Sequence, residues 1–360
     1  MMELTRRSVL VAAAALAAPG VALAATQASK GRVLTVSCWQ NYGANDPAAL
    51  KSFEGMTGAK VNLVYFTSED GLLEMLRQGG VGKIDVCLPN LEYVLQGARE
   101  GLFAPINTAK VTTWNALEPS FSQDPALRYQ GHVHAVPWVQ GVTALAVNPK
   151  AVTTKPTSWS ILWDPASQGK VAFFDDPTTA VMTAALYLGE DPQNPDLHKV
   201  KQALLALKKN VKLFWSSGDD WTKAYLTGEI TMGNLWSGLA GTMIANHQDL
   251  EFILPEDGTP AWGDTWAIVN RTKNLDLAYA WINFMTSPAF FTPWITSPGP
   301  NQQLAVPVNL EAVKELPPAA AAKLMAGPII DSKTKIAMQA GISTEALRKW
   351  TALWEVVKVS

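Results

Sequence analysis

Short apolar segments of strand character alternate along the chain with segments of helical periodicity. Residues 32–38, 60–66 and 84–88 are rich in β-branched and other apolar residues, a pattern typical of strands buried on both faces. Between these runs, Asp46 and Ser68 stand where a helix N-cap is expected, and each precedes apolar residues spaced along one helical face. The β-α-β-α-β order predicts a parallel sheet covered by helices.

The same alternation returns in the second half of the chain. Residues 171–174, 212–215 and 230–235 are predicted strands, and residues 197–207 carry an apolar stripe at helical spacing. The segment 347–357 shows that helical spacing again near the end of the sequence. We therefore predict an α/β protein of two lobes, each a mainly parallel sheet flanked by helices.

Two strand-like segments, 136–147 and 263–269, are predicted to cross between the lobes, because no Gly/Ser-rich linker separates the halves. A chain that enters the second lobe and returns leaves a cleft between the two. Ligands of open α/β sheets bind beyond the carboxyl ends of the strands, so we expect a binding site in this cleft. The predicted lobe 1 comprises 31–140 and 263–308, and lobe 2 comprises 141–262 and 309–360.

The first two dozen residues have the pattern of an export signal. Arg6 and Arg7 precede the apolar run 9–18, and the small residues that end at Ala24 match a signal-peptidase site. The run is shorter than the roughly 20 residues that span a bilayer. We predict a twin-arginine signal over 1–24, cleaved near Ala24, with an ordinary secretory signal as the alternative. Either signal predicts a periplasmic protein that is not an integral membrane protein.

Composition narrows the class of protein further. The chain of 360 residues is 48% hydrophobic and 17% charged, which excludes a disordered protein and allows two or three domains. The formal net charge is −2, so the chain has no excess of basic residues that would indicate nucleic-acid binding. Two cysteines are too few for a disulfide scaffold or for a zinc module built from cysteines.

Tryptophan is unusually frequent among the aromatic residues, with 14 Trp against 11 Phe and 7 Tyr. Trp39 and Trp236 each follow a predicted strand directly, and Trp262 precedes the second crossing. These positions place three indole rings at the predicted cleft. Six other tryptophans are assigned to core packing: Trp159, Trp163, Trp266, Trp281, Trp350 and Trp354.

A series of short motifs carries a resemblance to a known family. In chain order they are Trp39-Gln40-Asn41-Tyr42, Asp85-Val86-Cys87-Leu88-Pro89, Val136-Pro137-Trp138, Ser158-Trp159-Ser160-Ile161-Leu162-Trp163, Phe174-Asp175-Asp176, Trp236-Ser237-Gly238 and Trp262-Gly263-Asp264-Thr265-Trp266. From Val33 to at least Asn309 the chain resembles the periplasmic spermidine/putrescine-binding proteins of ABC importers. The resemblance implies the periplasmic binding protein fold. It also implies a monomer without cofactor or metal, which delivers a small cationic or zwitterionic solute to an inner-membrane ABC permease and its ATPase.

The resemblance also implies which residues bind the solute. In that family the methylene groups of the ligand lie between aromatic rings, and its ammonium groups lie on carboxylates. A ring attracts a cation by about 0.5–2 kcal/mol, and a buried ammonium needs a paired acceptor because an unpaired buried charge is costly. On this basis Trp39, Tyr42, Trp236 and Trp262 form the walls, Asp176 and Asp264 bind ammonium groups, and Asn41, Asn90, Glu92 and Ser216 complete the predicted site.

The chain departs from the family pattern at several of these positions. Asn41 and Thr179 stand where the family has acidic residues, and Leu304 or Ala305 stands where it has an aromatic residue. In the opposite direction, Glu92 replaces the usual tyrosine. Asp175 also competes with Asp176 for its role. A linear polyamine is therefore one possibility, and a shorter diamine, a cationic amino compound or an opine-like zwitterion fits equally well.

Two residue pairs could carry other chemistry. His132 and His134 would share one face of a strand and could hold a metal, but further ligands would be needed, so we expect an exposed loop instead. Cys38 and Cys87 end strands that should be neighbours in the sheet. Side-by-side parallel strands rarely offer good disulfide geometry, so free buried thiols are favoured over a disulfide.

Enzyme signatures are sparse. The sequence has no Gly-x-Ser-x-Gly elbow, no phosphate loop and no dinucleotide fingerprint. Twin-arginine export often accompanies cofactor-loaded oxidoreductases, which is the one reason to keep an exported cofactor enzyme as the alternative of another class. We predict a binding protein without catalytic residues.

Overall fold

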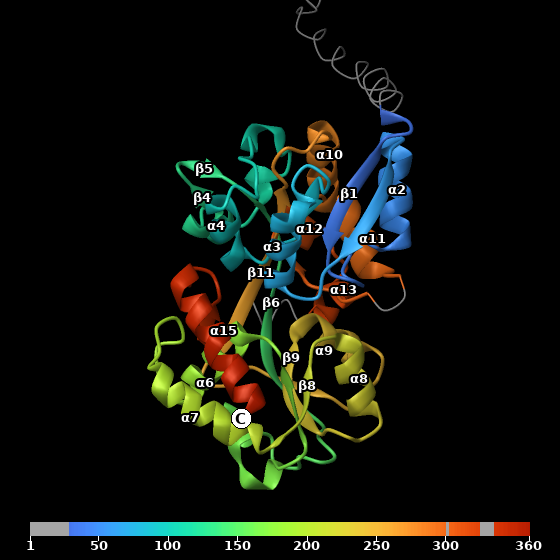
Figure 1. Ribbon diagram of the computed structural model, residues 1–360. Helices are drawn as coiled ribbons and strands as arrows, with labels where there is room; N and C mark the ends of the chain where they lie inside the picture. The colour runs from blue at the N-terminus through green and yellow to red at the C-terminus, as the bar shows by residue number, and fades with distance from the viewer. Residues whose placement is uncertain (1–28, 300–301, 325–334) are drawn as a thin grey trace, which may run out of the picture.

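The computed structural model describes residues 29–299, 302–324 and 335–360 (Figure 1). The predicted signal peptide over 1–24 lies outside these residues. The main strands are β1 (Val33–Cys38), β2 (Lys60–Tyr65), β3 (Val86–Cys87), β6 (Val136–Val147), β7 (Val171–Phe174), β8 (Val211–Trp215), β9 (Met232–Trp236) and β11 (Thr259–Ile268). Shorter strands are β4 (Arg128–Tyr129), β5 (His132–Val133), β10 (Glu251–Ile253), β12 (Val306–Pro307) and β13 (Ile336–Met338).

The main strands form one sheet in the order β2-β1-β3-β11-β6-β9-β7-β8. At one end β1 runs parallel to β2 and β3, and at the other end β7 runs parallel to β8 and β9. The long strands β6 and β11 lie in the middle, antiparallel to each other and to their neighbours β9 and β3. The two parallel pieces confirm the predicted βαβ order, and the two predicted crossings are these central strands.

Helices cover both ends of the sheet. Those around β1–β3 are α2 (Pro47–Thr57), α3 (Glu69–Met75), α4 (Leu91–Arg99), α5 (Pro119–Ser122), α10 (Leu275–Met285), α11 (Pro288–Thr296), α12 (Leu310–Glu315) and α13 (Pro318–Lys323). Those around β7–β9 are α6 (Pro177–Tyr187), α7 (Leu197–Lys208), α8 (Gly218–Leu226), α9 (Ser237–Ala245) and α15 (Thr344–Val359). Figure 1 shows an upper and a lower lobe with β6 and β11 running between them. This arrangement confirms the predicted two-lobed α/β fold.

The predicted helix starts are set by side-chain caps. Asp46 accepts hydrogen bonds at 3.0 Å from the backbone N–H groups of Ala48 and Ala49, which would otherwise lack partners at the start of α2. Gly58 ends that helix at φ 74°, where glycine avoids a steric penalty. Ser68 caps α3 in the same manner as Asp46 caps α2.

Each lobe has its own hydrophobic core. The upper core is built around buried strand residues such as Leu34 and Val36, and the lower core lies on both faces of β7. Along β6, Val142 belongs to the upper core and Val147 to the lower core. The segment 309–324, assigned by sequence to lobe 2, contributes buried residues to the upper core instead, because α12 packs against α11.

Five of the six tryptophans assigned to packing are fully buried: Trp159, Trp266, Trp281, Trp350 and Trp354. The sixth, Trp163, is half-buried and stacks on Tyr187 with ring centroids 4.0 Å apart. The apolar stretch around Ala278–Ile295 divides into α10 and α11. Within the described part of the chain, no helix has the length and apolar character to cross a membrane.

The strand register decides whether the two cysteines can form a disulfide. Cys38 and Cys87 are buried free thiols. Cys87 lies opposite Ser37 in the β1–β3 ladder, so its side chain and that of Cys38 point to opposite faces of the sheet, which prevents a disulfide.

The pair His132 and His134 was expected in an exposed loop. This expectation is wrong for His134, which is buried with Nδ1 3.1 Å from the Phe103 carbonyl oxygen. No group of three or more potential metal ligands occurs among the described residues.

Candidate ligand-binding site

A cavity of about 300 Å³ lies between the two lobes. Segments that follow β1, β2, β3, β7, β8 and β9 line it, together with residues of β11, so it lies at the carboxyl ends of the parallel strands. Nine of the ten predicted site residues line this cavity: Trp39, Tyr42, Asn90, Glu92, Asp176, Ser216, Trp236, Trp262 and Asp264.

The tenth predicted residue, Asn41, is not among the described residues that line the cavity. Its backbone has φ 58°, in the left-handed region that asparagine tolerates. Its carbonyl oxygen accepts from the backbone N–H of Gln303 at 2.8 Å, and its side-chain oxygen accepts from Asn45 at 3.2 Å. Asn41 therefore shapes the loop between β1 and α2, and its predicted contact with the ligand stays a prediction.

Aromatic side chains from both lobes face the cavity. In the upper lobe Trp39 packs on Phe66 with ring centroids 4.5 Å apart. In the lower lobe Trp236 packs edge-on against Phe174 at 4.9 Å and against Trp215 at 4.8 Å. The rings are held by other rings, so each wall has a fixed orientation before any ligand arrives.

Trp262 contributes a wall from the central strand β11. It pairs with Gly141 on β6, and a Cβ atom at Gly141 would lie 2.3 Å from the Trp262 ring. Glycine at this position therefore lets the indole lie directly on the neighbouring strand. The buried indole Nε1 of Trp262 has no hydrogen-bond partner in the described part of the chain.

Asp264, two residues further along β11, is held by two side chains. The Tyr42 hydroxyl donates to its Oδ2 at 2.7 Å. In the orientation of the Asn90 amide that places its nitrogen toward the two carboxylates, Nδ2 donates to Asp264 Oδ1 at 2.6 Å and to Glu69 Oε1 at 2.8 Å. The carboxylate is only 5% exposed, and no cationic side chain of the described ranges pairs with it.

Glu69 is a cavity residue that the sequence analysis did not identify. It directly follows the predicted N-cap Ser68, in the first turn of α3, where a glutamate has an ordinary structural role. In the structure it is 7% exposed and lines the cavity, and its buried Oε2 has no partner among the residues that the structure describes. The signal that could have found it is its position after the strand β2, which is the same signal that located Trp39 and Trp236.

The carboxylates of Asp175 and Asp176 differ in their hydrogen-bond and ion-pair partners. Asp175 accepts from the Trp354 indole at 2.7 Å and pairs with Lys358 at 2.9 Å, so its charge is compensated inside the lower lobe. Asp176 caps α6 by accepting from the backbone N–H groups of Thr178 and Thr179. No lysine, arginine or histidine of the described ranges forms an ion pair with Asp176, so of the two carboxylates it is the one without a charge partner there.

Burial shifts the ionisation of four acids that line the cavity, namely Glu69, Glu92, Asp176 and Asp264. Loss of hydration raises the pKa of Glu92 to about 8, of Asp264 to about 7 and of Asp176 to about 6. Desolvation and then repulsion from its acidic neighbours raise the pKa of Glu69 well above its usual range. No lysine, arginine or histidine occurs among the described lining residues. Without a basic neighbour among the described lining residues, these acids tend to keep their protons in the unliganded protein, and a bound cation would favour their charged forms.

Together these features define a class: a two-lobed α/β binding protein with a solute cleft between lobes that are joined by crossing strands. The family model for bacterial extracellular solute-binding proteins matches residues 48–326, and the chain belongs to this family.

Individual relatives support the same placement. The chain is 30% identical over 283 residues to the spermidine/putrescine-binding periplasmic protein of Salmonella typhimurium, covering 78% of this chain and 79% of that protein. It is 28% identical over 284 residues to the putrescine-binding periplasmic protein PotF of Escherichia coli, covering 73% and 75%. The solved structure of the spermidine/putrescine ABC transporter substrate-binding protein PotD from Streptococcus pneumoniae superimposes with a TM-score of 0.72 at 21% identity, covering 91% and 99%.

Proposed function

We propose that this protein is the periplasmic solute-binding component of an ABC importer and that it captures a polyamine or a related small amine in the interlobe cleft. The observation that carries the proposal is the cavity itself, which has the buried carboxylates of Glu69, Glu92 and Asp264, the partly buried carboxylate of Asp176, aromatic walls and no basic lining side chain in the described ranges. An amine supplies the missing positive charge, and its methylene groups fit between rings. The names of the relatives reported above support the same solute class.

The nine cavity-lining residues predicted from the sequence are proposed to contact the solute, and Glu69 is added to them. Asp176 and Asp264 accept from ammonium groups, while Trp39, Trp236 and Trp262 flank the alkyl body. An opine-like zwitterion would bring a carboxylate into this cavity. The acidic lining disfavours that alternative, because like charges repel at short range.

Export and delivery complete the proposal. Residues 1–24 act as a twin-arginine signal that is cleaved near Ala24, and the mature protein works as a monomer in the periplasm. The loaded, closed form then docks on an inner-membrane permease that is driven by an ATPase, without a chemical reaction on the solute. The lobes are proposed to follow the predicted boundaries, except that 309–324 moves with the upper lobe.

A thermal-shift panel tests the proposed solute class. We expect putrescine or spermidine to raise the melting temperature of the mature protein, because a ligand at a hundred times its Kd adds about 2.7 kcal/mol to the free energy of unfolding. 4-Aminobutyrate and a neutral sugar serve as matched controls and should leave the melting temperature unchanged. Stabilisation by the controls and not by any amine would overturn the assignment.

A further inference from the structure

We propose that Glu69 and Glu92 form a specificity-determining subsite in the upper lobe that binds a guanidinium head group, so that a guanidino-alkylamine is preferred over a simple diamine. This inference rests on the proposed function, since it assigns the head group of an amine-bearing solute in the same cleft. Glu92 stands where the resembling family has tyrosine, and Glu69 belongs to none of the motifs that carry the resemblance.

The two glutamates present acceptor atoms that the protein leaves unpaired. Glu69 is 7% and Glu92 6% exposed, and both line the cavity. Oε2 of each is buried and has no hydrogen-bond partner among the described residues. A buried carboxylate oxygen without a donor is costly, so this arrangement is best satisfied by a ligand that brings several N–H groups.

The carboxylates are gathered at one place in the cavity. Asn90 Nδ2 lies within hydrogen-bonding distance of Glu69 Oε1 and Asp264 Oδ1 at once, which fixes those two side chains beside each other. Glu92, Asp264 and Asp176 all act electrostatically on Glu69. One cationic head group of the ligand can therefore contact more than one carboxylate at this place.

A guanidinium fits this cluster better than an ammonium does. It carries five N–H donors in a planar fork, against three on a compact ammonium, and it can therefore reach several carboxylates at once. It is also more weakly hydrated, so its transfer into a buried acidic site costs less. Agmatine and putrescine share a four-carbon body and one ammonium group and differ only in the second head group, which makes them a matched pair of probes.

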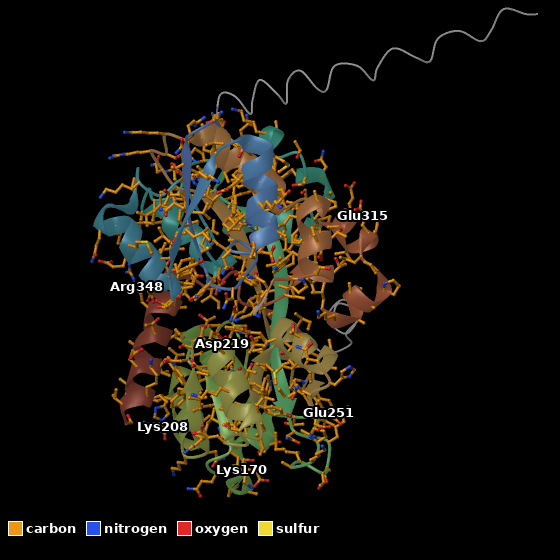
Figure 2. All side chains as sticks on the ribbon, turned by 90° about the vertical axis from the view of Figure 1, so that its right-hand side faces the viewer. Lys170, Lys208, Asp219, Glu251, Glu315 and Arg348 are labelled. Atoms are coloured by element: carbon orange, nitrogen blue, oxygen red, sulfur yellow. The ribbon has the colours of Figure 1, made fainter. Side chains whose placement is uncertain are left out.

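Calorimetric titration of the mature protein with agmatine and putrescine tests the inference. For the wild type we expect agmatine to bind at least tenfold more tightly than putrescine. Glu69→Gln and Glu92→Gln should each weaken agmatine at least tenfold and bring the ratio of the two affinities toward one. Glu315→Gln is the matched control, because Glu315 is exposed at the end of α12 (Figure 2) and should leave both affinities unchanged.

The outcomes separate this inference from the proposed function. Equal or tighter binding of putrescine by the wild type overturns the guanidinium subsite and leaves the amine-binding function standing. A ratio of affinities that Glu69→Gln and Glu92→Gln do not change has the same consequence. If neither probe nor any other amine binds, the proposed function itself fails. Both glutamine variants keep the side-chain shape, and an unchanged far-ultraviolet circular dichroism spectrum verifies that they fold.

Discussion

Single carboxylates in the cleft couple proton binding to stability. Between pH 4.5 and about 8 the folded protein holds a proton on Glu92 that the unfolded chain releases, because the pKa of Glu92 is raised to about 8 on folding. The folded state then binds more protons than the unfolded state, so stability falls as the pH rises through this window. This is the reverse of the usual behaviour of an ion-paired acid, and it follows from burial without a cation.

The first prediction concerns this pH dependence. We expect the melting temperature of the unliganded wild type to fall between pH 6 and pH 8.5, and Glu92→Gln to reduce that fall. At pH 8.5 the variant should be more stable than the wild type by roughly 1–3 kcal/mol, since the uncompensated charge is gone. Differential scanning calorimetry measures the effect, with Glu315→Gln as a control that follows the wild type. A variant that loses stability at pH 8.5 contradicts the account.

Among single residues, the sequence could indicate those cavity-lining residues that follow strands or belong to motifs, such as Trp236 and Asp264. It did not identify Glu69, because a glutamate in the first turn of a helix has an ordinary structural explanation. The motif position of Asn41 could not reveal where its side chain lies, because its backbone has a positive φ. Only the folded loop shows that Asn41 accepts from Asn45 outside the cavity.

At the scale of elements, the cleft depends on how closely β6 and β11 approach each other. Gly141 and Trp262 are paired in their ladder, and the missing side chain of the glycine leaves the space that the indole fills. The position of an aromatic wall is therefore fixed by a residue that does not line the cavity.

The second prediction follows from that contact. Gly141→Ala should weaken amine binding at least tenfold while the protein stays folded, because its Cβ would lie 2.3 Å from the Trp262 ring and displace it. Fluorescence titration measures the affinity. Gly55→Ala is the matched control, since a Cβ at Gly55 meets nothing within 4 Å and alanine favours a helix. Equal affinity of Gly141→Ala and wild type would rule out this positioning role.

Most elements could be predicted because local signals agreed with the tertiary fold, as the caps at Asp46 and Ser68 illustrate. The predicted strand 84–88 shortens to β3, because its ladder with β1 joins only Val86 and Cys87. The packing of α12 on α11 could not be predicted, because an amphipathic helix does not specify its partner.

At the scale of the whole molecule, the carboxylates that surround the proposed ligand come from both lobes. Glu69 and Glu92 belong to the upper lobe, whereas Asp176 begins a helix of the lower lobe. A cation between them makes contacts that exist only when the lobes are close, so binding should shift the population toward a closed state. The strands β6 and β11 are where such a movement would bend (Figure 1).

The third prediction is compaction on binding. Small-angle scattering should give a smaller radius of gyration with saturating amine than without it, and tryptophan fluorescence should change because Trp39, Trp236 and Trp262 line the cleft. A neutral sugar at the same concentration is the control. An unchanged radius of gyration at confirmed saturation would show that the lobes do not close.

The most direct test of the central claim, that buried carboxylates bind the cationic group of an amine, is calorimetry on Asp264→Asn. We expect the mature wild type to bind at least one of putrescine, spermidine and agmatine, and Asp264→Asn to bind the same amine about 2–5 kcal/mol more weakly. Asp219→Asn, which removes an exposed carboxylate in the first turn of α8 (Figure 2), should match the wild type. Undiminished affinity in Asp264→Asn, or no heat from any amine with the wild type, would contradict the account.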